Sequence, residues 1–179
     1  MSIDLGKAAP AAERREPSLR RCLGHFATGV AIVTYEADDG PRGVTINSLT
    51  SVSLDPPLLL VCLDKRSKAI GWLPRAPFAI NVLHASQRSL AWHFAGKRID
   101  GIEPGWSRAG ATPRLSESLA WLACEPWSCH DAGDHIIIVG RISEFGMDAD
   151  FETGAQRPLC FFRGEFVELP PRSQPASSV

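Results

Sequence analysis

Side chains that can hydrogen-bond to a polar ligand are concentrated in residues 43–57, GVTINSLTSVSLDPP. The segment begins as a strand, because Val44 and Ile46 alternate with polar residues. A run of hydroxyl residues follows, consisting of Ser48, Thr50, Ser51 and Ser53. Hydroxyls and backbone N–H groups at this density suit the edge of a planar polar ligand or a phosphate. An ordinary serine-rich turn between two strands has the same composition.

The start of a short helix is a second place where an anion could bind. This helix is expected to begin at residues 64–67 and to end at Trp72, before Pro74. Ser67 is well placed as its N-cap. Positive side chains flank this position at Lys65, Arg66 and Lys68. Unpaired N–H groups and cations pointing the same way favour an anion, although a capped helix with solvated lysines fits the same residues.

Two classes of catalytic site depend on the histidines, and neither has its usual motif. A serine nucleophile would need a base, and the candidates are His84, His93, His130 and His135. No GxSxG motif is present to place a serine beside any of them. A metal ion could be held by the turn residues Cys129, His130, Asp131, Asp134 and His135. Zinc sites normally take ligand pairs from two separate segments, whereas these residues share one turn.

His135 has a further role to consider because it begins a strand directly after Gly133 and Asp134. Its ring can project at the rim of a barrel, where it could pack on a planar substrate or hydrogen-bond to it. The third candidate chemistry is accordingly an aromatic cofactor in the barrel mouth, with its phosphate at hydroxyls and a helix N-terminus. A turn histidine paired with Asp131 or Asp134 is the alternative.

Composition restricts the class of protein. The 179 residues are 44% apolar and 22% charged, as in a globular chain with one core. The net charge of −1 argues against a nucleic-acid-binding protein, and no apolar run reaches the ~18 residues of a membrane span. The N-terminus lacks the apolar core of a secretory signal. The five cysteines include no CxxC pair, which favours free thiols in a reducing cytoplasm.

One domain is expected over residues 17–169, between a flexible arm at 1–16 and a flexible tail at 170–179. Strands are predicted at residues 30–35, 43–47, 58–63, 78–83, 119–128, 135–145 and 158–169, the last with a break near residue 164. Helices are predicted at 18–28, 67–72 and 86–95, and a long loop at 97–118. Many strands joined by short turns favour a mainly β fold, an antiparallel barrel with a few short helices.

The predicted strand at residues 58–63, LLLVCL, is apolar on both faces. Such a strand lies at the centre of a structure, or it lines a barrel and also meets another surface. A second barrel would supply that surface, so a homodimer with a mostly apolar interface is expected.

Five short stretches resemble, in the same order, the short-chain flavin reductases, which are NAD(P)H-dependent partners of two-component flavin monooxygenases. They are residues 26–34, 43–57, 94–97, 133–135 and 158–164. The resemblance extends from about Leu19 to Leu169. It implies a split antiparallel β-barrel that binds FMN or FAD, a homodimer, and NADH or NADPH as co-substrate.

The resemblance also implies roles for individual residues. Neighbours of the flavin ring would be Thr45, Asn47 and Ser48, with further flavin contacts from Thr50, Ser51, Val52 and Ser53. The ribityl chain would lie along Cys62, Leu63 and Asp64, with the phosphate near Ser67. The phosphate or adenylate end would be closed by Phe94, Ala95 and Lys97, and His135 would lie beside the nicotinamide. Ala132 departs from the pattern, because many relatives have a second glycine there.

In this family hydride passes directly from the nicotinamide C4 to the flavin N5, so no side chain need act as a nucleophile or strong base. The protein would stack the two rings and stabilise negative charge on the reduced flavin. Alternatives are a flavin carrier or sensor without turnover and a barrel related to pyridoxamine-phosphate oxidases. The sequence does not decide whether the flavin is FMN or FAD, or whether the co-substrate is NADH or NADPH. A 2′-phosphate could meet loop arginines that are otherwise solvated, namely Arg98, Arg108 and Arg114.

Overall fold

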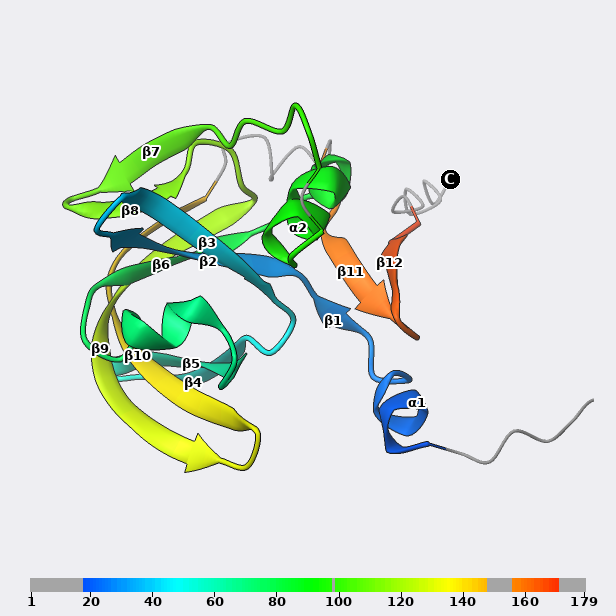
Figure 1. The fold of residues 1–179 in the computed structure, drawn as a ribbon, viewed down its shortest axis with the longest axis horizontal. Coiled ribbons are helices and arrows are strands. Elements are labelled where there is room, and N and C mark those ends of the chain that lie inside the picture. Colours follow the sequence, from blue (N-terminus) through cyan, green and yellow to red (C-terminus); the bar gives the residue numbers. More distant parts are fainter. Residues whose placement is uncertain (1–17, 98, 148–155, 171–179) are drawn as a thin grey trace, which may run out of the picture.

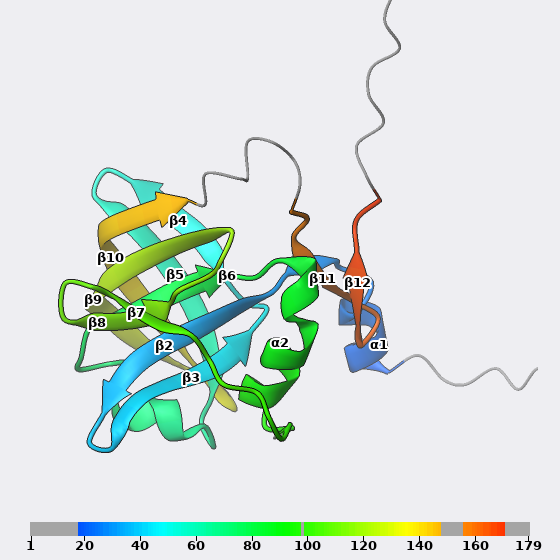
Figure 2. The same ribbon diagram turned by 90° about the horizontal axis from the view of Figure 1, so that it is seen from above.

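An antiparallel sheet forms the body of the computed structural model, which describes residues 18–97, 99–147 and 156–170. In that part of the chain its strands follow the order β3-β2-β6-β9-β10-β5-β4. Their bounds are β2 Ala31–Ala37, β3 Gly40–Ile46, β4 Thr50–Leu54, β5 Pro57–Asp64, β6 Phe78–Val82, β9 Ala120–Ala132 and β10 His135–Met147. Neighbouring strands pair antiparallel, and Figures 1 and 2 show the sheet curling around an interior. The expected antiparallel, mainly β architecture is confirmed.

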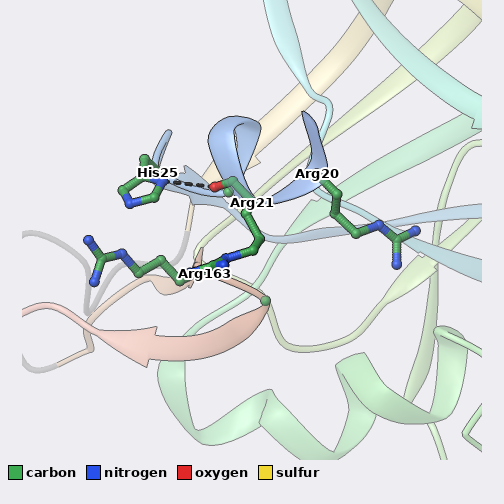
Figure 3. A pocket seen from close by; sticks show the side chains of 6 residues that line it. Arg20, Arg21, His25 and Arg163 are labelled. Atoms are coloured by element: carbon green, nitrogen blue, oxygen red, sulfur yellow. Dashed lines mark hydrogen bonds between the residues drawn. The ribbon is translucent and has the colours of Figure 1, made fainter. Parts of the chain in front are cut away.

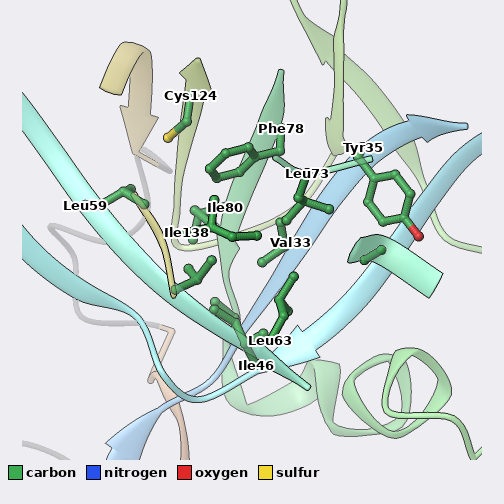
Figure 4. Packing of buried hydrophobic residues seen from close by; sticks show 13 residues of the cluster. Val33, Tyr35, Ile46, Leu59, Leu63, Leu73, Phe78, Ile80, Cys124 and Ile138 are labelled. Carbon is green, nitrogen blue, oxygen red and sulfur yellow. The ribbon is translucent and has the colours of Figure 1, made fainter. Parts of the chain in front are cut away.

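Apolar side chains that alternate along the strands fill the interior of the curled sheet. On β5, Leu59, Val61 and Leu63 are at most 2% exposed, whereas Leu58, Leu60 and Cys62 between them are only half-buried. Large side chains from β6 and β10 join this cluster, as Figure 4 shows for Phe78 and Ile138. Removal of this face from water stabilises the barrel. The other face of β5 is only half-buried, so this strand lines the barrel with one of its two apolar faces.

A smaller lobe lies beside the barrel (Figures 1 and 2). In the described chain it contains a second sheet of β1 Thr28–Gly29, β11 Leu159–Phe162 and β12 Glu165–Glu168. Two helices accompany it, α1 Leu19–Leu23 and α2 Arg88–Phe94, the latter preceded by the 3₁₀ turn η2 Ala85–Gln87. A second buried cluster, including Leu83, Ala91 and Leu159, holds the lobe against β2. The helix predicted at residues 86–95 is confirmed in a shorter form as α2.

The barrel is split between β3 and β4. These are the two end strands of the sheet, and within the described residues they are not hydrogen-bonded to each other. Residues 47–49 cross from one to the other. Loops at such an opening have backbone groups outside the ladder, so the split is a natural place for a ligand.

The loop predicted at residues 97–118 is partly wrong, because it contains a hairpin of β7 Trp106–Ala109 and β8 Thr112–Leu115. Pro113 lies within β8 and the stretch has little alternation, so local sequence gives no strand signal. Distant side chains hold the hairpin in place. The Leu115 N–H donates to Asn81 Oδ1 at 2.8 Å, and the Thr34 hydroxyl donates to the Pro113 carbonyl at 2.6 Å.

The first and last predicted elements also differ from the structure. The first helix ends at Leu23 instead of continuing to residue 28, and Thr28 belongs to β1. The predicted final strand is a hairpin, because Arg163 and Gly164 both have positive φ, 51° and 87°, and reverse the chain. Ser18 does cap α1, since its Oγ accepts a hydrogen bond from the Arg21 N–H at 3.3 Å.

The turn predicted at residues 129–134 is shorter than expected. β9 continues to Ala132, so Cys129, His130 and Asp131 lie in a strand. Their neighbours across the ladder are Ile138, Ile137 and Ile136 of β10, and this pairing overrides the weak strand propensity of the three residues. The arm at 1–16 and most of the tail at 170–179 lie outside the described residues. Among the helices of the described residues, none has the length and apolar character needed to cross a membrane.

Candidate active site

A cavity of about 230 Å³ opens at the split in the barrel, between the end of β3, the end of β5 and the start of β10. It is lined by Val44, Thr45, Ile46, Asn47, Ser48, Cys62, Leu63, Asp64, Ser67 and His135. All of these except Val44 and Ile46 were predicted as site residues from the sequence. We call this the first cavity. Its lining combines hydroxyl, amide and carboxylate groups with apolar side chains, which is typical of small-molecule sites.

Ser48 is the residue that ties the loop across the split to β5. Its Oγ accepts a hydrogen bond from the Cys62 N–H at 3.0 Å and donates one to the Cys62 carbonyl at 3.0 Å. Thr45 makes a comparable link, because its hydroxyl donates to the Ala91 carbonyl of α2 at 2.7 Å. These two hydroxyls therefore shape the cavity wall, with lone pairs remaining for a ligand.

Asp64 and His135 face each other in the β5–β10 ladder at the mouth of the first cavity. The Asp64 carboxylate accepts hydrogen bonds from the Arg66 guanidinium and backbone N–H, which hold the pKa of Asp64 far below its usual value. The His135 Nδ1 lies 2.7 Å from Asp134 Oδ1, and this hydrogen bond lowers the pKa of Asp134. A carboxylate at Nδ1 fixes the proton there, so Nε2 is the nitrogen left to meet a ligand.

The 3₁₀ helix η1 Lys68–Gly71 begins where the first cavity ends. Ser67 caps it as predicted, with its Oγ accepting from the Ala69 N–H at 3.3 Å. Two of the three flanking cations already hold ion pairs, Lys65 with Asp131 at 2.5 Å and Arg66 with Asp64 at 2.5 Å. Among the described carboxylates, none forms an ion pair with Lys68. Lys68 is thus the cation available to an anionic ligand.

A second cavity of about 700 Å³ continues from the first, and Val44 and Ser67 line both. Its other lining residues are Tyr35, Ala37, Asp38, Asp39, Arg42, Gly43, Lys68, Ala69, Trp72, Phe94 and Gly96. Of these, only Phe94 was predicted as a flavin-site residue, and Lys68 was predicted to flank an anion site. The aromatic residues come from β2, from the end of η1 and from α2, so their meeting has no local signal in the sequence.

The remaining predicted site residues lie outside the lining of the first cavity. Thr50, Ser51, Val52 and Ser53 lie on edge strand β4, largely exposed. Ala95 is exposed at the end of α2, and the Lys97 ammonium lies 3.7 Å from the centre of the Trp92 ring. Their assigned contacts remain predictions.

The serine nucleophile and the metal site, which were the other two catalytic hypotheses, find little support in the structure. The serine–histidine contacts join residues that are close in sequence. Ser86 Oγ lies 2.7 Å from His84 Nδ1, and Ser128 Oγ lies 3.0 Å from His130 Nε2. In both pairs the residues are two apart in the chain, and His84 is the N-cap of η2. Within the described ranges, no group of three or more His, Cys, Asp or Glu side chains is placed to hold a metal ion. Asp131 of the suggested metal cluster pairs instead with Lys65.

Loop arginines proposed for a 2′-phosphate have other partners. Arg108 forms an ion pair with Glu36 at 2.8 Å, and the Arg114 guanidinium lies 4.6 Å from the centre of the Trp121 ring. Arg98 lies outside the described residues.

A separate basic surface, which the sequence did not indicate, lies at α1 and the β11–β12 turn (Figure 3). Its lining includes three arginines, Arg20, Arg21 and Arg163, together with His25.

Comparison with known proteins shows similarity to one family over most of the chain. Residues 23–170 match the family model described as "Flavin reductase like domain". The chain is 38% identical over 165 residues to an NADH-dependent flavin reductase of Rhodococcus sp, covering 88% of this chain and 89% of the relative. It is 38% identical over 176 residues to HsaB, the reductase subunit of a flavin-dependent monooxygenase of Rhodococcus jostii (strain RHA1), covering 96% and 87%. Among solved structures, the NADH:FAD oxidoreductase SgcE6 of Streptomyces globisporus C-1027 superposes with a TM-score of 0.74 at 34% identity, covering 93% of this chain and 97% of that one.

Proposed function

The chain belongs to the flavin reductase-like domain family, and on that basis we propose that it reduces FMN or FAD with NADH or NADPH. The reduced flavin would pass to a separate flavin-dependent monooxygenase, as in the relatives named as reductase subunits. The observation that supports this most directly is the first cavity, where eight residues predicted for flavin or nicotinamide meet. Five free cysteines among the described residues agree with a cytoplasmic location.

The residues of the first cavity suit a flavin. Half-buried Val44 offers apolar contact area, while Asn47 and Ser48 offer an amide and a hydroxyl for the polar edge of the ring. Ser67 and Lys68 suit the phosphate. When bound, flavin supplies the ring that accepts hydride from a reduced nicotinamide. The chain's own task is then to orient two planar rings and to exclude water from between them, which needs no nucleophile or strong base.

Steady-state assays of the purified chain test the proposal. NADH or NADPH oxidation should depend on added FMN or FAD, with saturation in both substrates. A chain that oxidises neither nicotinamide with either flavin would not be a flavin reductase. Flavin binding without turnover would instead favour a carrier or sensor.

His135→Ala is expected to raise KM for the nicotinamide about tenfold, the cost of one lost contact of ~1.4 kcal/mol, and to change flavin affinity little. The reason is that His135 lines the first cavity, and the contact of Nδ1 with Asp134 leaves Nε2 for a ligand. His130→Ala is the matched control, since His130 lies nearby on β9 and contacts Ser128. Equal kinetic constants for the two variants would make His135 a structural residue only.

We also propose a homodimer, supported by the outward face of β5 and β10. Half-buried Leu60 pairs with Val139 there, and half-buried Cys62 pairs with Ile137. Exposed apolar side chains also lie near the ends of β4 and β10, notably Leu54 at 89% and Phe145 at 72%. Apolar side chains left partly open to solvent in this number often meet a partner.

Light scattering at low micromolar concentration should give about twice the chain mass of 19.4 kDa. Leu60→Asp should shift the protein to the monomer, because it places a charge in the centre of the proposed interface. Arg75→Glu, at an exposed position just after η1, is the control and should remain dimeric. A wild-type monomer at this concentration would contradict the dimer.

A further inference from the structure

The turn between β9 and β10 carries His135 at the very end of the paired sheet. The β5–β10 ladder ends with Asp64 opposite His135, and the β9–β10 ladder closes with Ala132 opposite His135. Only Gly133 and Asp134 lie between the two strands, and both are exposed. The end of a hairpin is free to move unless contacts from elsewhere hold it. The place of the His135 ring therefore depends on what this turn touches.

Lys65, the first residue after β5, contacts both sides of the turn. Its backbone N–H donates to the Asp134 carbonyl at 3.0 Å, on the side of β10. Its ammonium donates to Asp131 Oδ2 at 2.5 Å, on the side of β9. Lys65 and Asp131 are 66 positions apart in the chain, so this contact fixes the hairpin against a distant segment. The turn is thus held at two points by one residue.

The segment that contains Lys65 also forms the wall of the first cavity. Asp64 and Ser67 line that cavity, and the Ser67 N–H donates to the Asp64 carbonyl at 2.8 Å. Arg66 holds the Asp64 carboxylate with its side chain and its backbone N–H. Lys65 therefore joins the turn of His135 to the wall beside which a flavin would lie. A ring bound at the turn is then kept at a set place relative to a ring bound at the wall.

The ion pair of Lys65 and Asp131 is exposed, so its effect on folding is small. The two side chains are 40% and 76% exposed, and exposed pairs usually add little to stability. The hydrogen bond from Lys65 lowers the pKa of Asp131, so the carboxylate stays ionised at neutral pH. Neither residue lines either cavity, and neither lies in the five stretches that carry the family resemblance. A role in this place is therefore one of positioning and not of contact with the flavin.

We propose that Lys65 and Asp131 are a positioning pair for the nicotinamide, which holds the β9–β10 turn so that His135 meets the co-substrate at a fixed place. The inference rests on the proposed function, because it takes His135 as the residue beside the nicotinamide. The pair acts through His135, so it should affect the binding of NADH or NADPH and leave the binding of flavin almost unchanged.

Lys65→Gln and Asp131→Asn test this role, because positioning and simple charge attraction predict opposite results for the second variant. NADH and NADPH are anions, so removal of a carboxylate would lower KM if charge alone mattered. If the pair positions His135, each variant should raise KM for the nicotinamide about fivefold, and the double variant should raise it no further. Changes in kcat and in the flavin dissociation constant should stay below about twofold. Lys65→Arg keeps the ion pair and should restore the wild-type KM.

The decisive measurement repeats Lys65→Gln in the His135→Ala background. There it should have no further effect on KM, because the ring that it positions is gone. Glu36→Gln is the matched control, since it breaks an exposed ion pair, that with Arg108 at 2.8 Å, outside both cavities. It should leave KM and flavin affinity unchanged, and urea denaturation should show all variants folded.

Three results would overturn the positioning role while leaving flavin reduction intact. They are an unchanged KM in both single variants, a lower KM in Asp131→Asn, and a fivefold effect of Lys65→Gln that persists without His135. A loss of flavin affinity equal to the rise in KM would also overturn it, because the pair would then support the whole cavity. A wild-type chain that oxidises neither nicotinamide with either flavin would instead overturn the proposed function itself.

Discussion

Replacement of Asn81 by leucine is expected to lower the free energy of unfolding by about 3 kcal/mol or more. Asn81 is fully buried on β6, and its amide uses both ends. Nδ2 donates to the Ile32 carbonyl and to Thr34 Oγ1, each at 3.0 Å, while Oδ1 accepts from the Leu115 N–H at 2.8 Å. Leucine has a similar size but leaves the Leu115 N–H without an acceptor in a site that water cannot easily reach.

Urea denaturation measures this loss. Asn47→Leu is the control, because Asn47 is exposed at the split and its replacement should change stability by less than about 0.5 kcal/mol. Thr34→Val should destabilise less than Asn81→Leu. It removes the bonds of the hydroxyl to the Pro113 carbonyl and to Asn81 Nδ2, but the Asn81 amide keeps its bonds to Ile32 and Leu115. A loss below about 1 kcal/mol for Asn81→Leu would mean that β8 is held by its own pairing with β7 and not by this network.

The hairpin of β7 and β8 shows why local sequence missed part of the fold. β5 can be recognised from local sequence, because it is a run of apolar residues that alternate between buried and half-buried positions. β8 has Pro113 in its middle, and its place depends on Asn81 and Thr34, which lie far away in the chain. Tertiary hydrogen bonds of this kind override local propensity and leave no periodic signal.

The candidate site was predictable where it lies on a contiguous motif. Thr45, Asn47 and Ser48 are close together in sequence, and Ser67 has the local signature of an N-cap. All four were predicted as site residues, and all four line the first cavity. Trp72 and Tyr35 were missed because the second cavity forms only when β2, η1 and α2 come together. A resemblance to a family carries over positions that match its motifs, and these two aromatic residues lie in none of the five matching stretches.

Ser48→Ala is expected to weaken flavin binding about tenfold, equivalent to ~1.4 kcal/mol, through the shape of the split barrel. β3 and β4 share no ladder among the described residues, so the hydrogen bonds between Ser48 and Cys62 replace strand pairing at this point. Without the hydroxyl, the Cys62 N–H and carbonyl lose their partner and the loop at 47–49 gains freedom. Bound flavin would then have to order that loop, and the cost of ordering appears as lost affinity.

Ser143→Ala is the matched control, because Ser143 also donates to a backbone carbonyl, that of Ala123 at 3.2 Å, but lies outside both cavities. Both variants should lose at most about 1 kcal/mol of stability, the usual worth of one or two half-buried hydrogen bonds, whereas only Ser48→Ala should change the flavin dissociation constant. Fluorescence titration and urea denaturation on the same samples separate the two effects. Equal flavin affinity in Ser48→Ala and wild type would show that the backbone alone fixes the loop at 47–49. The hydroxyl-rich segment would then contact the flavin without holding the loop in place.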